Sequence, residues 1–382
     1  TENLITGLNI DWQSGNLTTN FDLYMSKVDY SRDMRNPIIR RNMVKSEVVF
    51  NGTDNLALFD MGSNFLEKDG YTWFRANISQ VYMDGENTGA TLAFDYDPGL
   101  DGFSAVKFGI HWDESDVDVT RSNNVILTNP PEGGPAMVDA ALGEDPFGWT
   151  FMPGDNVMPQ QWLTMSWDAA AALDSRMSMS GLDELGIDLA ASYRTKEQTT
   201  SFYGQLDIDT MMRDVPLTGN IGVRVVNVDV TSDAHALGLG PDPVPITTSG
   251  DYTEILPSMN LKWNFSDSFA LRLGYSKTQT RPEFQEMAPM IQVNRVWDPE
   301  EPEVNGLARA GNADLDPIMS DNFDLTMEWY PESGGSGVFS LFYKDVEDFI
   351  VSQTVEDTTV EGLDGTYNLT QPINYSDGKV KG

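Results

Sequence analysis

Residues 87–114 read NTGATLAFDYDPGLDGFSAVKFGIHWDE, two runs of alternating residues around a turn rich in Pro, Gly and Asp. Apolar side chains occupy every second position of both runs: Ala90, Leu92, Phe94 and Tyr96, then Val106, Phe108, Ile110 and Trp112. A period of two is typical of β-strands. Strands of about 9–11 residues with one apolar and one polar face are what a membrane-spanning β-barrel requires. The stretch therefore predicts an antiparallel hairpin whose apolar face meets lipid.

The same unit recurs along the chain, at about residues 8–25, 202–225, 259–275 and 323–343. Gly, Asn, Asp, Ser and Pro fill the short turns, as expected of hairpins. We count ten spanning strands and the start of an eleventh. Long polar segments separate the hairpins, at about 30–86, 115–195, 231–251, 278–320 and 346–377. Because outer-membrane barrels have short periplasmic turns and long extracellular loops, the short turns are expected to face the periplasm.

Two of the long segments contain further patterns. Tyr71–Tyr82 is expected to extend a strand beyond the membrane. Trp162, Met165, Ala169 and Leu173 have helical spacing, which predicts a short helix within the 115–195 loop. The fold class expected for the whole chain is all-β, an antiparallel up-and-down transmembrane barrel with long extracellular loops.

The composition excludes some classes of function. The chain has 382 residues, no cysteine, and 59 acidic against 24 basic residues, for a formal charge of −35. A surplus of acids argues against nucleic-acid binding, which needs a basic surface. No apolar run approaches the roughly 18 residues of a transmembrane helix. If this chain crosses a membrane, it does so as strands.

Charged residues on the polar face form candidate cross-strand pairs. Asp95 and Lys107 are predicted to lie nearly opposite each other in their hairpin, and Asp324 and Lys344 in another. Opposed charges of this kind stabilise a sheet by a fraction of a kcal/mol, of order 0.2–1. We expect these four residues to form ion pairs on the wall of the barrel lumen, with contact to a ligand or a plug as the alternative.

Aromatic residues fall into two groups. Trp149, Trp162, Trp167 and Trp297 lie in loops and are the candidate substrate-binding residues, since aromatic faces stack on sugar rings or flat chelates. The alternative is that they pack the loops together. The second group lies near strand ends on the apolar face and is expected in the interfacial aromatic girdle: Trp12, Trp112, Trp263 and Trp329.

No catalytic constellation, phosphate-binding loop or metal motif is present, so we expect no enzyme, no cofactor and no metal site. His111 is expected to be a structural residue of the polar face, and His235 lies in a loop beside Asp233. One alternative is calcium binding through nearby acids, although their spacing lacks the turn glycine of a calcium loop. Those acids are Asp113, Glu114, Asp116 and Asp118.

Several stretches, in this order and spacing, resemble the C-terminal barrel of TonB-dependent outer-membrane receptors of the long-loop proteobacterial type. They are Gly219–Arg224, Leu256–Leu261, Leu271–Lys277, Thr280–Pro282, Gly311–Pro317, Phe323–Leu325, Glu328–Tyr330, Leu341–Val346 and Val380–Gly382. The better match covers about residues 190–382, and residues 1–114 match more loosely in pattern.

The resemblance implies a barrel of about 22 strands whose lumen holds a plug. It also implies a plug-borne motif that recruits TonB, which couples the inner-membrane proton gradient to uptake. No stretch of residues 1–382 resembles the plug, a signal peptide or the last strands, so we expect a fragment comprising about half of a barrel. Half of a barrel has unpaired edges that lipid does not tolerate, so the fragment alone is not expected to transport anything.

These observations favour a receptor of the Gram-negative outer membrane that contacts lipid, TonB through its plug, and a scarce large nutrient. An oligosaccharide is favoured over a ferric siderophore because acidic loops disfavour an anionic chelate. A second class, a soluble secreted glycan-binding protein or glycosidase, would use paired carboxylates. The outward aromatic residues on every strand argue against it. A passive porin is a third class, disfavoured by the long loops.

Overall fold

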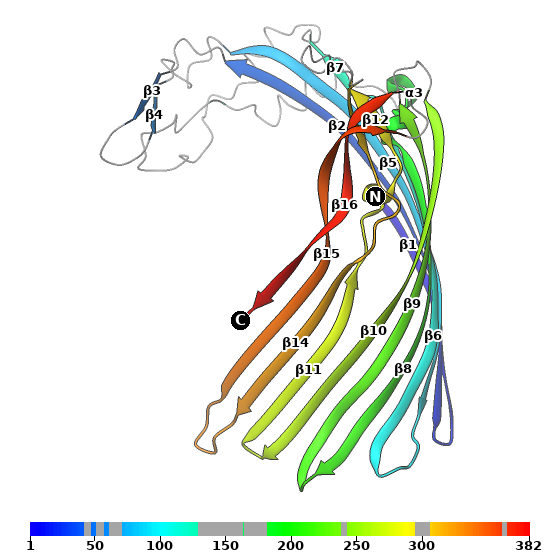
Figure 1. Ribbon diagram of the computed structural model, residues 1–382. Helices are drawn as coiled ribbons and strands as arrows, with labels where there is room; N and C mark the ends of the chain where they lie inside the picture. Colours follow the sequence, from blue (N-terminus) through cyan, green and yellow to red (C-terminus); the bar gives the residue numbers. More distant parts are fainter. Residues whose placement is uncertain are drawn as a thin grey trace. The chain divides into compact units, whose positions relative to one another are not determined.

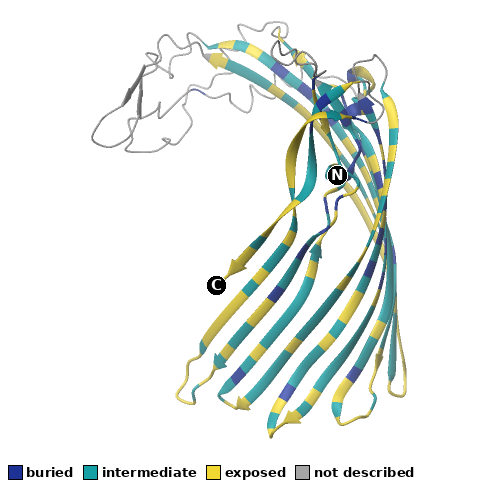
Figure 2. Ribbon diagram, in the orientation of Figure 1, coloured by how far each residue is buried: buried dark blue, intermediate teal, exposed yellow. Residues whose placement is uncertain are grey.

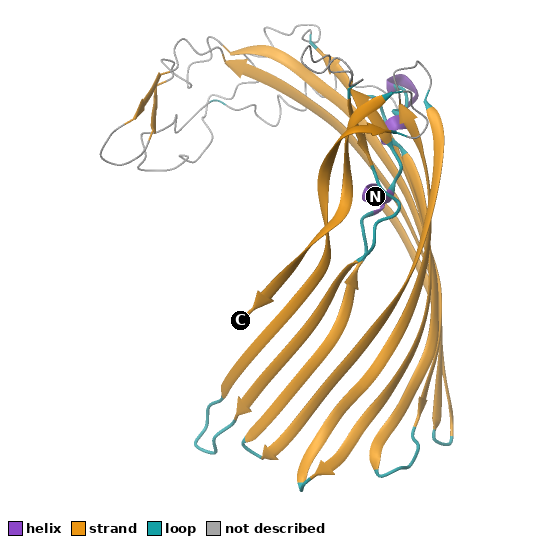
Figure 3. Cartoon of the chain, viewed as in Figure 1, coloured by secondary structure: helices purple, strands orange, loops and turns teal. Residues whose placement is uncertain are grey.

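The computed structural model describes residues 1–41, 47–50, 57–60, 71–128, 163, 182–237, 243–294, 306–360 and 365–382. The chain divides into two compact units. One comprises Thr1–Tyr30, Tyr82–Thr120 and Asp188–Gly382, and the other comprises Ser31–Val81 and Arg121–Ile187. Strands make up nearly all of the described part (Figure 3). Among the described residues, no helix combines the length and the apolar character needed to cross a membrane.

Eleven long strands follow one another through the main sheet in chain order (Figure 1). They are β1 (Glu2–Ser14), β2 (Leu17–Arg41), β5 (Tyr71–Tyr96), β6 (Gly102–Arg121), β8 (Tyr193–Met212), β9 (Val215–Leu237), β10 (Val244–Ser266), β11 (Phe269–Thr280), β14 (Ile318–Trp329), β15 (Gly337–Thr359) and β16 (Thr366–Lys381). The registers of β1 with β2 and of the successive pairs from β6 to β16 are antiparallel. This confirms the predicted up-and-down order of ten strands and an eleventh.

The two faces of the sheet are those that the alternation predicted. We call the face that carries Phe108 and Phe202 the outer face, and the face that carries Lys107 and Gln205 the inner face. Phe108 is 45% exposed and Phe202 54% exposed, although both are large apolar residues. Exposed positions recur along the long strands (Figure 2). In water such exposure is costly, at about 25 cal/mol per Å². Contact with lipid, as the alternation predicts for this face, would remove that cost.

The strands run further than the apolar alternation indicated. The predicted loop at 346–377 is wrong, because β15 continues to Thr359 and β16 begins at Thr366. The 231–251 segment is likewise mostly strand, since β9 ends at Leu237 and β10 begins at Val244. The physical reason is that backbone pairing continues above the lipid band, where the outer face no longer needs apolar side chains.

The smaller unit holds short elements, the C-terminal part of β2 and the N-terminal part of β5. β7 (Val125–Leu127) pairs with Ala76–Ile78 of β5, and α3 (Leu182–Leu185) contributes Leu185 to a buried cluster with Ala76 and Ile78. β3 (Glu47–Phe50) pairs with β4 (Ala57–Asp60). The predicted extension Tyr71–Tyr82 is confirmed as the first part of β5. The helix predicted around Trp162–Leu173 lies outside the described residues.

In the main unit, the segment between β11 and β14 folds against the inner face. It contains α4 (Phe284–Met287), β12 (Ile291–Asn294) and β13 (Leu307–Ala310). β12 pairs in parallel with β9, and β13 pairs in parallel with β16. Met287 and Leu315 from this segment are buried with three valines of the inner face of β9, which are Val226, Val228 and Val230. This segment, called the covering segment below, therefore covers the inner face of the sheet at the end away from the short turns, which we call the upper half.

Elsewhere in the same unit, the 3-10 helix η1 (Leu189–Ala191) lies directly before β8. A side chain ties it to the covering segment, because Nε2 of Gln292 donates a hydrogen bond to the carbonyl oxygen of Ala190 over 3.3 Å. The start of β8 and the segment between β11 and β14 are thus held together.

Candidate functional site

The inner face near the short turns is a network of charges and amides. Lys107 Nζ lies 2.8 Å from a carboxylate oxygen of Asp207 and 3.6 Å from one of Asp95. Gln205 donates a second hydrogen bond to Asp207 over 2.7 Å. The predicted neighbourhood of Asp95 and Lys107 is confirmed. Asp207 was missed because it comes from β8, whose register against β6 is not set by any local turn.

The second predicted pair is placed differently. Asp324 lies opposite Phe342, and Lys344 lies opposite Asn322, so the two charges are diagonal neighbours on the inner face. Direct opposition, as predicted, is wrong. The turn is centred on Ser333, because Trp329 pairs with Gly337, whereas the prediction needed a centre one residue later. Moving the centre by one residue moves every pairing by two, which keeps the face and changes the partner.

His111 belongs to the same inner network. Its Nδ1 lies 2.8 Å from the hydroxyl of Thr91, and its Nε2 lies 3.0 Å from a carboxylate oxygen of Asp113. The ring of Tyr24 stacks at a centroid distance of 6.5 Å. Both ring nitrogens thus have partners in the wall of the sheet, as expected of a structural histidine.

Above the lipid band, the outer face becomes charged. After Trp112, the outward positions of β6 are Glu114, Asp116 and Asp118, and they face Arg194 and Lys196 of β8. Arg194 donates two hydrogen bonds to Asp116, over 2.9 and 2.6 Å, and Lys196 lies 2.7 Å from Glu114. The hydrogen bonds from Arg194 hold the pKa of Asp116 below its usual value.

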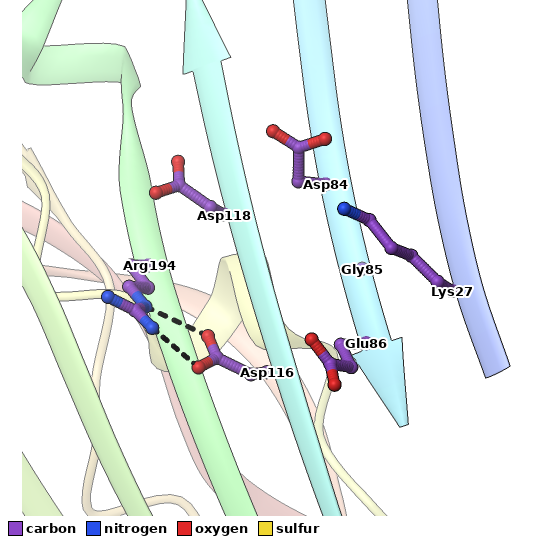
Figure 4. A pocket seen from close by; sticks show the side chains of 7 residues that line it. All are labelled: Lys27, Asp84, Gly85, Glu86, Asp116, Asp118 and Arg194. Atoms are coloured by element: carbon purple, nitrogen blue, oxygen red, sulfur yellow. Dashed lines mark hydrogen bonds and ion pairs between the residues drawn. The ribbon is translucent and has the colours of Figure 1, made fainter. Parts of the chain in front are cut away.

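A cavity of about 270 Å³ opens among these charges (Figure 4). Its lining comes from four strands: Lys27, Asp84, Gly85, Glu86, Asp116, Asp118 and Arg194. The protonated carboxyl of Asp84 donates a hydrogen bond to the carboxylate of Asp29, which raises the pKa of Asp84. The four acids considered for calcium do not converge here. Asp113 lies on the inner face, and Glu114 and Asp116 already have basic partners.

The covering segment makes a second, inner site. Arg281, directly after β11, forms an ion pair and a hydrogen bond with the buried Glu197 of β8. Burial raises the pKa of Glu197, and Arg281 opposes that shift. A cavity of about 260 Å³ lies between β10 and residues 313–316. Sequence reasoning missed this cavity because no periodic pattern marks it.

The predicted loop aromatics are not tested by the structure. Trp149, Trp162, Trp167 and Trp297 lie outside the described residues. Of the tryptophans predicted to form a girdle, Trp12 and Trp329 are 58% and 56% exposed, close to the short turns. This exposure agrees with a position at a membrane interface.

Comparison with known proteins agrees with this architecture. A family model described as TonB dependent receptor-like, beta-barrel, matches residues 11–382. Among curated proteins, the comparison finds no match.

Solved structures with a similar fold are themselves receptors and transporters. The copper transporter OprC is 14% identical, with a TM-score of 0.50 and coverage of 100% of this chain and 43% of that chain. The ferric-catecholate import receptor Fiu from E. coli K12 is 14% identical, with a TM-score of 0.49 and coverage of 99% and 43%. The ferric yersiniabactin uptake receptor FyuA from Yersinia pestis is 11% identical, with a TM-score of 0.45 and coverage of 91% and 36%.

This chain spans less than half the length of these three structures. At these identities the likeness concerns the fold alone. The family model, in contrast, matches nearly the whole chain, over the same strands whose apolar outer and polar inner faces were described above. The chain belongs to the TonB-dependent receptor β-barrel family.

Proposed function

We propose that the protein carrying this chain is a receptor of the Gram-negative outer membrane that imports a scarce large solute, with energy delivered through TonB. The observation that carries the proposal is the match of the family model to residues 11–382. The exposed apolar outer face supports a lipid environment, and the polar inner face supports a wet lumen. In this proposal TonB is contacted by a plug domain outside residues 1–382.

The solute that we favour is a neutral oligosaccharide. The chain carries 59 acidic and 24 basic residues, so anionic chelates meet repulsion of about 1 kcal/mol per close pair even in water. Sugar hydroxyls, in contrast, donate hydrogen bonds to carboxylates. A ferric siderophore receptor is the competing reading within the same class.

Two measurements test this proposal. The intact, tagged protein is expected to fractionate with outer membranes and to need detergent for extraction; recovery from the soluble periplasm or the medium would remove the receptor proposal. The purified receptor is then titrated with neutral oligosaccharides and with ferric catecholates while tryptophan fluorescence is followed. Saturable binding of an oligosaccharide is expected. Binding confined to ferric chelates would replace the substrate class and keep the receptor.

The loop tryptophans are tested in the same titration. Trp162→Ala and Trp167→Ala are expected to weaken oligosaccharide binding if these rings stack on sugars. Unchanged affinity in both variants would assign the two rings to packing of the loop.

A further inference from the structure

The cavity between β10 and residues 313–316 lies at an interruption in the ladder of strands. β11 pairs with β10 from Ser258 onward and ends at Thr280. Residues 249–252 of β10 lie beyond that pairing, and in the described part of the chain the covering segment takes the place of a strand there. The carbonyl oxygen of Ala313 lies 2.8 Å from the position that a Cβ of Gly250 would occupy. Gly250 therefore permits the close approach that forms one wall of the cavity.

The lining combines an apolar floor with an acidic rim. Val230, Met287 and Leu315 provide the floor and are themselves part of a packed cluster that includes the ring of Tyr252. Asp314 and Asp316 are exposed and line the cavity; Ser249 and Asp251 line it from β10, although both are outer-face positions of that strand. None of the described residues that line it is basic. A ligand for this cavity thus has an apolar face, several hydrogen-bond donors and no negative charge.

The acidic rim is held in place before any ligand arrives. Asn312 accepts a hydrogen bond from the backbone N–H of Asp314 over 3.0 Å. Asn374 of β16 accepts one from the N–H of Asp316 and donates one to its carbonyl oxygen, each over 2.9 Å. The backbone N–H of Asn312 donates to the carbonyl oxygen of Glu286 over 2.7 Å. Rigid positioning of this kind lowers the ordering cost of binding.

We propose that this cavity is a binding subsite for one neutral monosaccharide unit, with the carboxylates of Asp314 and Asp316 accepting sugar hydroxyls. The volume of about 260 Å³ is below the roughly 300–1,000 Å³ of pockets that hold drug-sized ligands, so it suits a single ring. The C–H face of the ring packs on the apolar floor. The subsite deepens the proposed oligosaccharide function and rests on it.

The first test is direct and uses crystals of the intact receptor that carries this chain. Crystals are soaked separately in millimolar glucose, galactose, mannose and xylose. We expect density for at least one sugar in the cavity, with oxygen atoms within hydrogen-bond distance of Asp314 or Asp316. An empty cavity in all four soaks overturns the proposal, as does a sugar seated in the cavity without contact to either aspartate.

The second test uses variants and the oligosaccharide that binds the receptor in the fluorescence titration. Asp314→Asn combined with Asp316→Asn is expected to raise Kd about tenfold or more, because each charge-assisted hydrogen bond to a hydroxyl is weakened. The matched control is Asp267→Asn, at an exposed turn between β10 and β11, which is expected to leave Kd unchanged. Gly250→Ala, which pushes on Ala313 and distorts the cavity wall, is expected to weaken binding without removing a charge.

The outcomes separate the subsite from the proposed function. Tight oligosaccharide binding with no change in the double variant overturns the subsite and leaves the function standing. A sugar in the cavity of a receptor that binds and transports only ferric chelates supports the subsite and overturns the substrate class. Heat-modifiable migration in gels verifies that every variant is folded before Kd is compared.

Discussion

The lower and upper halves of β9 have opposite polarity, although they belong to one unbroken strand. Near the short turn, Ile221 and Val223 on the outer face are 45% and 44% exposed. Further up, the apolar positions change phase: Val226, Val228 and Val230 lie on the inner face and are at most 5% exposed. The register with β8 shows no bulge across this change. The change of phase therefore reflects the surroundings and not the backbone.

One strand can therefore place its apolar side chains outward toward lipid in one half and inward toward a packed core in the other half. In the lower half the apolar side chains face outward, as lipid requires, and polar ones line the inside. In the upper half the outer face is charged, and the apolar side chains form a packed core beneath the covering segment. The pair Val225–Val226 marks where the membrane band ends on β9, and the charged positions after Trp112 mark it on β6.

The largest expected effect is a loss of packing in the upper half. Met287 is 2% exposed and belongs to the cluster on the inner face of β9. Met287→Ala is expected to reduce the free energy of unfolding of the intact receptor by about 2–5 kcal/mol, since it leaves a cavity. Met211→Ala, at a residue that is 61% exposed, is the matched control and should change it little. Equal effects would mean that the covering segment does not pack as a core.

The edge of the membrane band on β9 is tested by introducing an arginine at either of two outer-face positions. Ile221→Arg places a cation in the lipid band and is expected to cost about 2–4 kcal/mol of stability in vesicles, most if it lies at the midplane. Asp229→Arg, on the same face above the boundary, is expected to be tolerated. Urea unfolding in lipid vesicles measures both. Two tolerated variants, or two equally damaging ones, would place the boundary elsewhere.

The smallest effect concerns the charged outer face and depends on pH. Arg194 lowers the pKa of Asp116, so the pair contributes stability above the unfolded pKa of about 3.9 and loses it as pH falls through the lower, folded pKa. Because both side chains are partly exposed, the contribution is below about 1 kcal/mol. The stability difference between wild type and Asp116→Asn should be present at pH 7 and shrink toward pH 3. A difference that is constant with pH would contradict an ionic origin.

Local pattern was sufficient for the order of the strands, for their part near the short turns and for their two faces there, but not for their full length. The alternation at 87–114 predicted both faces of β5 and β6, and the neighbourhood of Asp95 and Lys107 followed because a short turn sets that register. Asp207 completes the same ion-pair network from a distant strand, and no local signal indicates it. The error at Asp324 and Lys344 has the same origin, since a turn of several glycines and serines leaves its centre undefined by one residue.

Less of the upper half could be predicted from the sequence, because the residues that contact one another there are far apart in the chain. The inner cavity combines the edge of β10 with residues 313–316 and is held by Asn374. Two signals were present. One is the stretch Gly311–Pro317, which was noted for its resemblance alone, and the other is Gly250, a glycine in the interior of β10. A glycine inside a strand often marks a place where another segment approaches closely, and here it does.

The covering segment makes two parallel pairings, β12 with β9 and β13 with β16, and these constrain the order of folding. Through them β9, β10, β11, β14, β15, β16, β13 and β12 form a closed circuit of hydrogen-bonded neighbours. The circuit closes only after β16 has paired, so the entropic cost of closing it arises late in folding. Until then β13 has an unpaired edge, and afterwards its amide protons are expected to exchange with solvent as slowly as those of the long strands beside it.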